Sequence, residues 1–333
     1  MHLAWAKGGT AVKSSSTGLK GVTREDMFVH GHGACPGCGY AATAKNIAKI
    51  LGPETVIYVP ASCLVVFGAL YPISAWKVPY IYSAFENTGA VITGLRAAYR
   101  HRDIKANVVG MAGDGGTFDI GLQALSGAAE RNEDVIYVCL DNEAYMNTGI
   151  QRSSATPFGA WTTTTPAGAV IQGNRRFKKD IAAIVAQHEV PYVATLSVAH
   201  FSDFVRKVEK AKGMSGFRFL HCLTPCVPGW RIEPSKGVSI NRLAVDTGMW
   251  TLYEVENGAP RVTYKPRDIT PVTEYLQLQG RFRHISEEDV RTLQSWLCRK
   301  WKAHYDEDVK EPPCVLAPRK AELGHDGDPL HGV

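Results

Sequence analysis

The chain alternates short, wholly apolar runs with polar segments. Four apolar runs have the length of a buried strand and stop at a polar or glycine-rich turn: residues 55–59, 107–113, 134–140 and 217–222. Between the second and third runs, residues 119–131 carry apolar side chains at helical spacing: Ile120, Leu122 and Leu125. Continuous apolar strands that alternate with helices are typical of a parallel sheet covered on both faces. The pattern therefore predicts an α/β fold, built on a parallel sheet with helices on both faces.

This regular alternation ends at Trp230. Glycine and proline are scattered through the residues that follow, with two short extended pieces at 249–255 and 261–265. A helix is predicted over residues 286–305, because Ser286 is followed by Glu-Glu-Asp and so combines an N-cap with an acidic first turn. No second sheet is predicted.

The pattern divides the chain into three predicted parts. An N-terminal arm covers residues 1–25 and includes a Ser/Thr/Gly-rich lead-in at 10–18. The main domain covers residues 26–230. An extension, residues 231–333, ends irregularly from residue 311, with a small independent domain as the less favoured alternative.

Composition narrows the class of protein. The chain has 333 residues, of which 45% are hydrophobic, enough for a substantial core in one large domain or two small ones. It has no run of about 18 apolar residues, so no membrane span is expected, and its N-terminus lacks the apolar stretch of a signal peptide. The net charge of +5 is modest. No basic stripe with interleaved aromatic residues is present, which argues against nucleic-acid binding.

Polar residues end two of the predicted strands. Gly113-Asp114-Gly115 ends the run at 107–113, and Asn142 follows the run at 134–140. The carboxyl ends of parallel strands meet at one edge of a sheet, where ligands of such folds bind. Mg²⁺ takes oxygen ligands and usually one or two carboxylates, with phosphates and water completing its shell. A tight turn is the alternative for the glycine pair alone, but the paired strands favour a magnesium-diphosphate site.

Four of the eight cysteines lie at strand ends or in loops: Cys35, Cys38, Cys63 and Cys226. Four thiolates from such positions fit an iron–sulfur cluster or a structural zinc. Zinc usually takes two close pairs, whereas here one pair joins two distant single cysteines, which favours iron–sulfur. A redox dithiol at the pair is a third interpretation. Cys222 is the rival fourth ligand, and the remaining cysteines are interpreted as structural thiols: Cys139, Cys298 and Cys314.

Two further polar features each have a structural and a functional interpretation. The densest basic run, residues 175–179, is predicted to be a solvated loop before a helix at 180–187, or a docking surface for an acidic partner. Three histidines have no partners at metal-ligand spacing and are interpreted as structural: His30, His32 and His188. His32, beside the cysteine pair, has a second interpretation as a hydrogen-bonding residue that tunes a cluster.

Together these motifs resemble the thiamine-diphosphate-binding β subunit of 2-oxoacid:ferredoxin oxidoreductases, the pyruvate synthase family. The resemblance runs from about Met27 to Trp230 and is carried by motifs in order: Gly-His-x-x-Cys-x-x-Cys-Gly (31–39), Cys63, Phe-Glu-Asn (85–87), Ala-Gly-Asp-Gly-Gly (112–116), residues 119–127, 141–151 and 162–166, and Pro225-Cys226. It implies a parallel-sheet thiamine-diphosphate-binding domain of the PP type, followed by an irregular C-terminal arm.

The resemblance also implies roles for individual residues. One [4Fe-4S] cluster would be held by Cys35, Cys38, Cys63 and Cys226. Mg²⁺ on the diphosphate would be bound by Asp114, Asn142 and the backbone carbonyl of Ala144. The phosphates would be lined by Gly113, Gly115, Gly116 and Thr117. The thiazolium ring would be bordered by Tyr145, Met146 and Asn147, with Asn147 as the catalytic residue that hydrogen-bonds the substrate adduct. Weaker candidates for substrate-pocket walls are Phe85 and Val66.

The activity implied by the resemblance is oxidative decarboxylation of a 2-oxoacid. The reaction would pass through an adduct on thiamine diphosphate, with one-electron transfers to the cluster, acyl transfer to coenzyme A, and ferredoxin or another final acceptor. Pyruvate is the first expectation, and 2-oxoglutarate, branched-chain, aromatic and oxalate-type substrates are alternatives. A non-oxidative thiamine-dependent decarboxylase and a non-catalytic relay subunit are the competing hypotheses.

One component of this chemistry is missing from the sequence. Thiamine diphosphate needs a glutamate against its aminopyrimidine, which in this superfamily comes from another domain. About 30 residues precede the cysteine pair, too few for a domain of ~100–150 residues. We therefore expect partner subunits to supply the glutamate, the arginine for the substrate carboxylate and a ferredoxin-like cluster, with residues 231–333 packing on them. Because thiolate clusters survive in reducing surroundings, the cytoplasm is the expected location.

Overall fold

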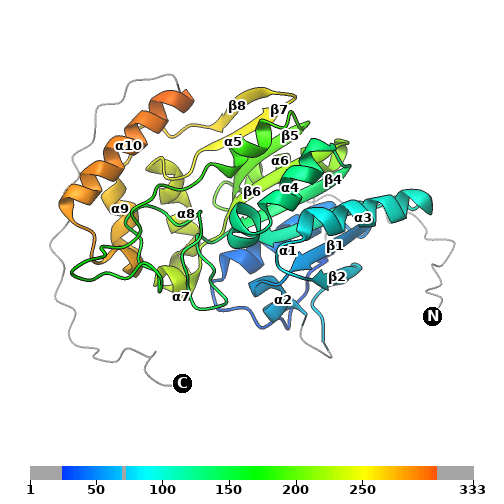
Figure 1. Ribbon diagram of the computed structural model, residues 1–333, viewed down its shortest axis with the longest axis horizontal. Helices are drawn as coiled ribbons and strands as arrows, with labels where there is room; N and C mark the ends of the chain where they lie inside the picture. The colour runs from blue at the N-terminus through cyan, green and yellow to red at the C-terminus, as the bar shows by residue number, and fades with distance from the viewer. Residues whose placement is uncertain (1–24, 70–72, 306–333) are drawn as a thin grey trace.

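The computed structural model describes residues 25–69 and 73–305, and within them eight strands form one sheet (Figure 1). The strand order is β2-β1-β3-β4-β6-β5-β7-β8. Six strands run parallel to one another: β1 (Thr55–Pro60), β2 (Tyr80–Ser83), β3 (Asn107–Gly113), β4 (Val135–Asp141), β5 (Tyr192–Ser197) and β6 (Phe217–Leu223). Two more extend the sheet antiparallel beyond β5: β7 (Leu252–Glu256) and β8 (Ala259–Tyr264).

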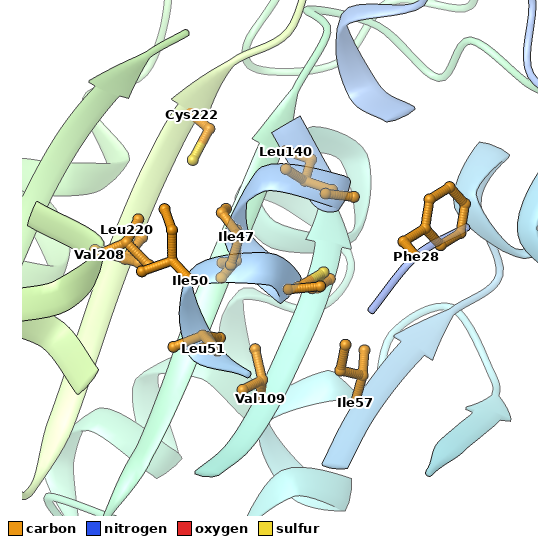
Figure 2. Close-up of a cluster of buried hydrophobic side chains, with 14 of the residues drawn as sticks. Phe28, Ile47, Ile50, Leu51, Ile57, Val109, Leu140, Val208, Leu220 and Cys222 are labelled. Carbon is orange, nitrogen blue, oxygen red and sulfur yellow. The ribbon is translucent and has the colours of Figure 1, made fainter. Parts of the chain in front are cut away.

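Helices cover both faces of the sheet. One face packs against α1 (Gly39–Leu51) and α6 (Phe201–Gly213), and Figure 2 shows Ile47, Ile50 and Val208 of these helices against side chains of the strands. The other face packs against three helices: α3 (Thr88–His101), α4 (Leu122–Glu130) and α5 (Ile181–Ala186). Side chains of β4 alternate between the two cores, as expected of a strand buried on both sides.

The predicted strands and two of the predicted helices are confirmed. The four apolar runs are β1, β3, β4 and β6, and the helices at 180–187 and 286–305 are α5 and α10 (Glu287–Tyr305). The helix predicted over 119–131 is shorter. It is preceded by a π-helical turn, η1 (Gly115–Asp119), and Ile120 is 57% exposed instead of facing the core. Strands β2 and β5 are additional to the prediction.

The described part of residues 231–305 is more regular than the sequence indicates. The extended pieces at 249–255 and 261–265 form the β7–β8 hairpin, whose turn is Asn257-Gly258 with positive φ at both residues. A third core lies beside the sheet and includes Trp230, Leu276 and Leu297. It is built from α10 and three shorter elements: α8 (Gly237–Asp246), α9 (Val272–Gln277) and η3 (Gly280–Phe282). The segment therefore packs on the main sheet and extends it.

Several predictions fall outside the described residues. These are the N-terminal arm except Glu25, its lead-in at 10–18, the irregular segment 311–333 and Cys314. In the part of the chain that the structure covers, none of the helices has the length and apolar character needed to cross a membrane.

Candidate active site

The predicted site residues gather at the carboxyl edge of the parallel strands. Asp114 directly follows β3, and Asn142 directly follows β4. Cys63 lies three residues beyond β1 as the first residue of α2 (Cys63–Gly68), and Cys226 lies three residues beyond β6 as the N-cap of α7 (Val227–Trp230). Because β1, β3, β4 and β6 are neighbours in this order, the strand ends bring residues from distant parts of the chain together.

A cavity of about 300 Å³ opens at this edge. Nine of the predicted site residues line it: Cys63, Gly113, Asp114, Gly115, Asn142, Ala144, Tyr145, Met146 and Asn147. Phe85 is also in the lining. Gly116 and Thr117 lie behind the lining in η1, where the Thr117 hydroxyl donates to the Gly113 carbonyl at 2.7 Å. Val66 is 46% exposed and is not among the lining residues.

Three polar groups converge inside the cavity in the manner of a cation site. One terminal atom of the Asn142 amide lies 3.0 Å from Asp114 Oδ1 and 2.9 Å from the Ala144 carbonyl oxygen. With the amide nitrogen at that position, two hydrogen bonds close the arrangement. With the oxygen there, three oxygens face one another, which a cation would stabilise, and oxygen ligands are those that Mg²⁺ prefers. The residues present therefore fit a magnesium ion.

The electrostatics at Asp114 point the same way. Asp114 is 1% exposed, and Ser153 Oγ donates to its Oδ2 at 2.5 Å. Burial, and then the nearby Asp141 carboxylate, raise the pKa of Asp114 well above its usual value. Burial also acts to raise the pKa of Asp141, but Lys178 and His221 outweigh it and lower that pKa. Among the described residues, Asp141 is thus the carboxylate paired with a cation, whereas Asp114 has no ion-pair partner.

The glycines of the motif make room for side chains of the site. A Cβ at Gly115 would lie 2.2 Å from the ring of Tyr145, and one at Gly116 would lie 3.2 Å from the Phe85 carbonyl oxygen. The same residues begin the π-helical turn η1, a distortion that is frequent at functional sites. A larger residue at position 115 would displace Tyr145 from the cavity wall.

Two hydroxyl groups that sequence analysis missed also belong to the cavity. Tyr40 and Ser62 line it, and their two buried hydroxyls lie beside each other with no hydrogen bond to any other described residue. Tyr40 is only 3% exposed, and a Cβ at Gly113 would lie 3.2 Å from its hydroxyl oxygen. Buried polar groups without partners are costly. A ligand with acceptor oxygens in the cavity would satisfy both hydroxyls.

The four predicted cluster cysteines are neighbours at the same edge. Burial, and then the thiols of its neighbours Cys226, Cys38 and Cys35, raise the pKa of Cys63 to about 12. Burial raises the pKa of Cys226 to about 12 as well, although the Gly229 N–H donates to its sulfur at 3.4 Å and acts to lower that pKa. Cys222, the rival ligand, is 1% exposed and packs in the core between the sheet and α6 (Figure 2).

The sulfur atoms of these cysteines do not converge on one centre. Within residues 25–69 and 73–305, no group of three or more His, Cys, Asp or Glu side chains is placed to hold a metal ion. The donor set nevertheless fits an iron–sulfur cluster, because four thiols with backbone N–H donors beside them are the groups that such clusters use. The ligand set remains a prediction. Three of the four cysteines lie at helix N-termini, where sequence analysis expected strand or loop ends.

The basic run at 175–179 is a loop before α5, as predicted, with residues 175–177 exposed, but Lys178 and Lys179 face the protein. The docking surface remains a prediction. The side chain of Lys178 is 15% exposed, and its Nζ lies 2.6 Å from Asp141 Oδ2 and 2.9 Å from Glu143 Oε1. Arg175 pairs with Asp289 at 2.7 Å, and Lys179 lies 3.7 Å from Asp119. The run therefore ties α10 and η1 to the site.

Two of the three predicted structural histidines have partners of that kind, and the role of His30 remains a prediction. His32 stacks on Phe28 with ring centroids 5.1 Å apart, and His188 is hydrogen-bonded to Ser126 Oγ at 2.8 Å. His221, which sequence analysis did not single out, lies 2.8 Å from Asp141 Oδ2, and burial lowers its pKa. A neutral His221 supports the orientation of the Asp141 carboxylate.

Comparison with known proteins agrees with this geometry. The family described as "Thiamine pyrophosphate enzyme, C-terminal TPP binding domain" matches residues 61–222. The chain is 49% identical to "Pyruvate synthase subunit PorB" of Methanocaldococcus jannaschii, over 84% of this chain and 96% of that protein. It is 45% identical to "Ketoisovalerate oxidoreductase subunit VorB" of Pyrococcus furiosus, over 84% and 92% of the two chains.

A solved structure shares the fold. It is a 2-oxoglutarate:ferredoxin oxidoreductase from Magnetococcus marinus, with a TM-score of 0.51 and 18% identity over 68% of this chain and 84% of that chain.

The sheet, its polar carboxyl edge and the matching domain family define the class: this is a thiamine-diphosphate-binding protein. Within that class, identities of 45% to 49% over most of both chains are decisive. The chain belongs to the family of β subunits of 2-oxoacid:ferredoxin oxidoreductases.

Proposed function

We propose that this chain is the catalytic β subunit of a pyruvate:acceptor oxidoreductase, which holds magnesium thiamine diphosphate beside a [4Fe-4S] cluster. One observation carries the proposal: Cys63 lines the same cavity as Asp114 and Asn142. A cluster ligand and the cation ligands therefore face one space. This proximity favours oxidative chemistry over the two competing hypotheses, because electrons leaving the reacting carbon have a short path to the cluster.

The residues of the cavity divide the work. Asp114, Asn142 and the Ala144 carbonyl hold Mg²⁺ on the diphosphate, and the backbone of 113–117 lines the phosphates. When bound, thiamine diphosphate supplies the carbanion that attacks the 2-oxo carbon and the sink for the electrons left by CO₂. Tyr145 and Met146 border its reactive ring, and Asn147 orients the oxygen of the bound substrate by a hydrogen bond.

Partner subunits complete the site. Among the described residues that line the cavity, Asp114 is the sole carboxylate, and none is a lysine, arginine or histidine. This lining supports the proposal that another subunit supplies the activating glutamate and the cation that binds the substrate carboxylate. A ferredoxin-like subunit, ferredoxin as final acceptor, and coenzyme A as acyl acceptor complete the proposed reaction. Residues beyond Trp230 are proposed to pack on these partners, and the complex is proposed to work in the cytoplasm.

Substrate choice is tested with the complete complex. The chain, co-expressed with its partner subunits and purified without oxygen, should reduce a viologen dye with pyruvate and coenzyme A faster than with 2-oxoglutarate, aromatic or branched-chain 2-oxoacids. Pyruvate stands first because relatives called pyruvate synthase share 46% to 49% of residues with this chain, against 44% to 45% for those called ketoisovalerate oxidoreductase. A branched-chain 2-oxoacid as the best substrate would overturn pyruvate while leaving the reaction class intact.

The reaction class has its own test in the same preparation. Release of an aldehyde without an electron acceptor would identify a non-oxidative decarboxylase. Zinc in place of iron at this chain would remove the electron path. The oxidative proposal requires CO₂ release that depends on both the acceptor and coenzyme A.

A further inference from the structure

A buried arginine joins the C-terminal part of the chain to the candidate active site. Arg281 lies in η3 and is 2% exposed. Its guanidinium lies 3.9 Å from the centroid of the Trp230 ring, and its Nη2 donates to Glu143 Oε2 at 2.6 Å. A charge at this depth persists only when it is paired and hydrogen-bonded. Arg281 and Glu143 therefore depend on each other.

Glu143 stands between the two proposed magnesium ligands of the β4 loop, Asn142 and Ala144. It is 3% exposed and has φ of 70°, in the left-handed region that a residue other than glycine seldom adopts. Its second carboxylate oxygen lies 2.9 Å from Lys178 Nζ, which also lies 2.6 Å from Asp141 Oδ2. Two cations thus hold the carboxylates on either side of Asn142.

The backbone of the same loop is held by three hydrogen bonds. The indole N–H of Trp230 donates to the Asn142 carbonyl at 2.8 Å, and the Thr156 hydroxyl donates to the Glu143 carbonyl at 2.7 Å. The Glu143 N–H donates to Asp141 Oδ1 at 3.0 Å. In this conformation the Asn142 side chain and the Ala144 carbonyl both face Asp114.

We propose that Arg281 and Lys178 are positioning residues that hold residues 141–144 in the conformation that binds magnesium diphosphate. A left-handed residue persists when its surroundings hold it there, and the two buried cations do so through the Glu143 side chain. The inference rests on the proposed function, because it takes Asn142 and Ala144 as magnesium ligands. It gives the C-terminal third a role in cofactor affinity as well as in packing.

The test compares two buried arginines. Arg218 is 3% exposed and pairs with Asp134, which precedes β4 at the opposite edge of the sheet. Asp134 keeps Arg96 as a second partner, just as Glu143 keeps Lys178. Arg281→Met and Arg218→Met therefore each remove one of the two cations paired with a carboxylate, at opposite ends of β4. Both should lower the unfolding temperature, but only the first should change cofactor affinity.

The readout is equilibrium binding of thiamine diphosphate, titrated with Mg²⁺, to the complete complex after the cofactor has been removed. We expect Arg281→Met to weaken binding by about 10-fold or more, the usual effect of losing a residue that orients a metal ligand. Arg218→Met should leave it unchanged. Adding Glu143→Gly to Arg281→Met should recover part of the affinity, because glycine adopts the left-handed conformation without a clamp.

Each outcome has one meaning. If wild-type complex binds no magnesium thiamine diphosphate, the proposed function fails. If it binds and Arg281→Met binds equally well, or both arginine variants weaken binding equally, the positioning role is wrong. If Arg281→Met does not fold, Arg281→Lys keeps the charge and should lower the affinity by a smaller, measurable factor. An unchanged affinity in Arg281→Lys would then overturn the inference.

Discussion

Strand β4 has an aspartate at each end, and the two ends differ in what their charges do. Asp134, at the amino end, is paired with Arg96 and Arg218 and also accepts the N–H of Gly216. At the carboxyl end, Asp141 is likewise paired with a cation, Lys178, and hydrogen-bonded to His221, but Asp114 on the neighbouring strand has no ion-pair partner among the described residues. The carboxylate at the amino edge is fully paired, whereas the carboxyl edge keeps one carboxylate, Asp114, without an ion-pair partner among the described residues; we call it the open carboxylate. This open carboxylate distinguishes the candidate site from the opposite edge.

The largest expected effect is that of Asp114→Asn. Removing the open carboxylate should reduce turnover of the complex to less than about 1% of wild type, since even residues that only orient a metal ligand cost 10- to 100-fold. Turnover with 2-oxoacid, coenzyme A and a viologen dye measures it. The control is Asp134→Asn at the other end of β4, which should lower stability and keep turnover. Equal losses in both variants would remove the distinction between the two edges.

The next effect concerns the cysteines at the open edge. Cys63→Ser should remove about four iron and four sulfide per chain from the purified complex, because a cubane cluster needs all four thiolates. Cys222→Ser, in the closed core, should keep the full iron content and lower only the unfolding temperature. Iron and sulfide analysis measures both. A full iron content in Cys63→Ser, or a loss in Cys222→Ser, would show that the proposed ligand set is wrong.

A smaller effect is expected at the two buried hydroxyls of the cavity, those of Tyr40 and Ser62. Tyr40→Phe and Ser62→Ala should each weaken thiamine diphosphate binding by roughly fivefold, the value of one hydrogen bond of about 1 kcal/mol. In the cofactor-free protein, Tyr40→Phe should instead raise the unfolding temperature, because it removes a buried hydroxyl with no hydrogen bond outside the cavity. Thermal unfolding with and without cofactor separates the two effects. Unchanged affinity in both variants would leave these hydroxyls outside the site.

The smallest effect on catalysis comes from a buried lysine far from the cavity lining. Burial lowers the pKa of Lys207 from 10.5 to about 8, although its Nζ lies 2.6 Å from Asp203. Between these two values the unfolded chain binds a proton that the folded chain does not. The free energy of unfolding should therefore rise with pH from 8 to 10.5, by up to about 1.4 kcal/mol per unit.

Lys207→Met should remove this rise and leave turnover at neutral pH unchanged. Denaturant unfolding at several pH values measures it. A rise that survives the substitution would belong to another group.

The sequence predicts those parts of the molecule that depend on local pattern. The runs that become β1, β3, β4 and β6 are apolar enough to recognise, and the polar residues at their ends locate the site. The β7–β8 hairpin was also accessible, because Asn257-Gly258 between alternating residues is a strong turn signal. Strand β5 carries Thr195 and Ser197 among its apolar residues, and the edge strand β2 is only four residues long, so neither forms a continuous apolar run.

The pairing of distant charges is beyond what local pattern can predict. Lys178 lies in a run of basic residues and looks solvated, yet its partners Asp141 and Glu143 are 37 and 35 residues away. The ion pair of Arg281 is even harder to predict from the sequence, because its partner Glu143 lies 138 residues before it. Tyr40 reads as a core residue of α1, and its position in the cavity lining is what distinguishes it from its neighbours in that helix. Partners, not residue types, decide which of these groups matter.

The lining of the cavity has a consequence for how such a complex is put together. The described wall holds one carboxylate, Asp114, and no lysine, arginine or histidine. If a partner subunit supplies the activating glutamate, as proposed, catalysis would begin only after that subunit has bound. Electrons would then be released only where the rest of the relay is already in place to receive them.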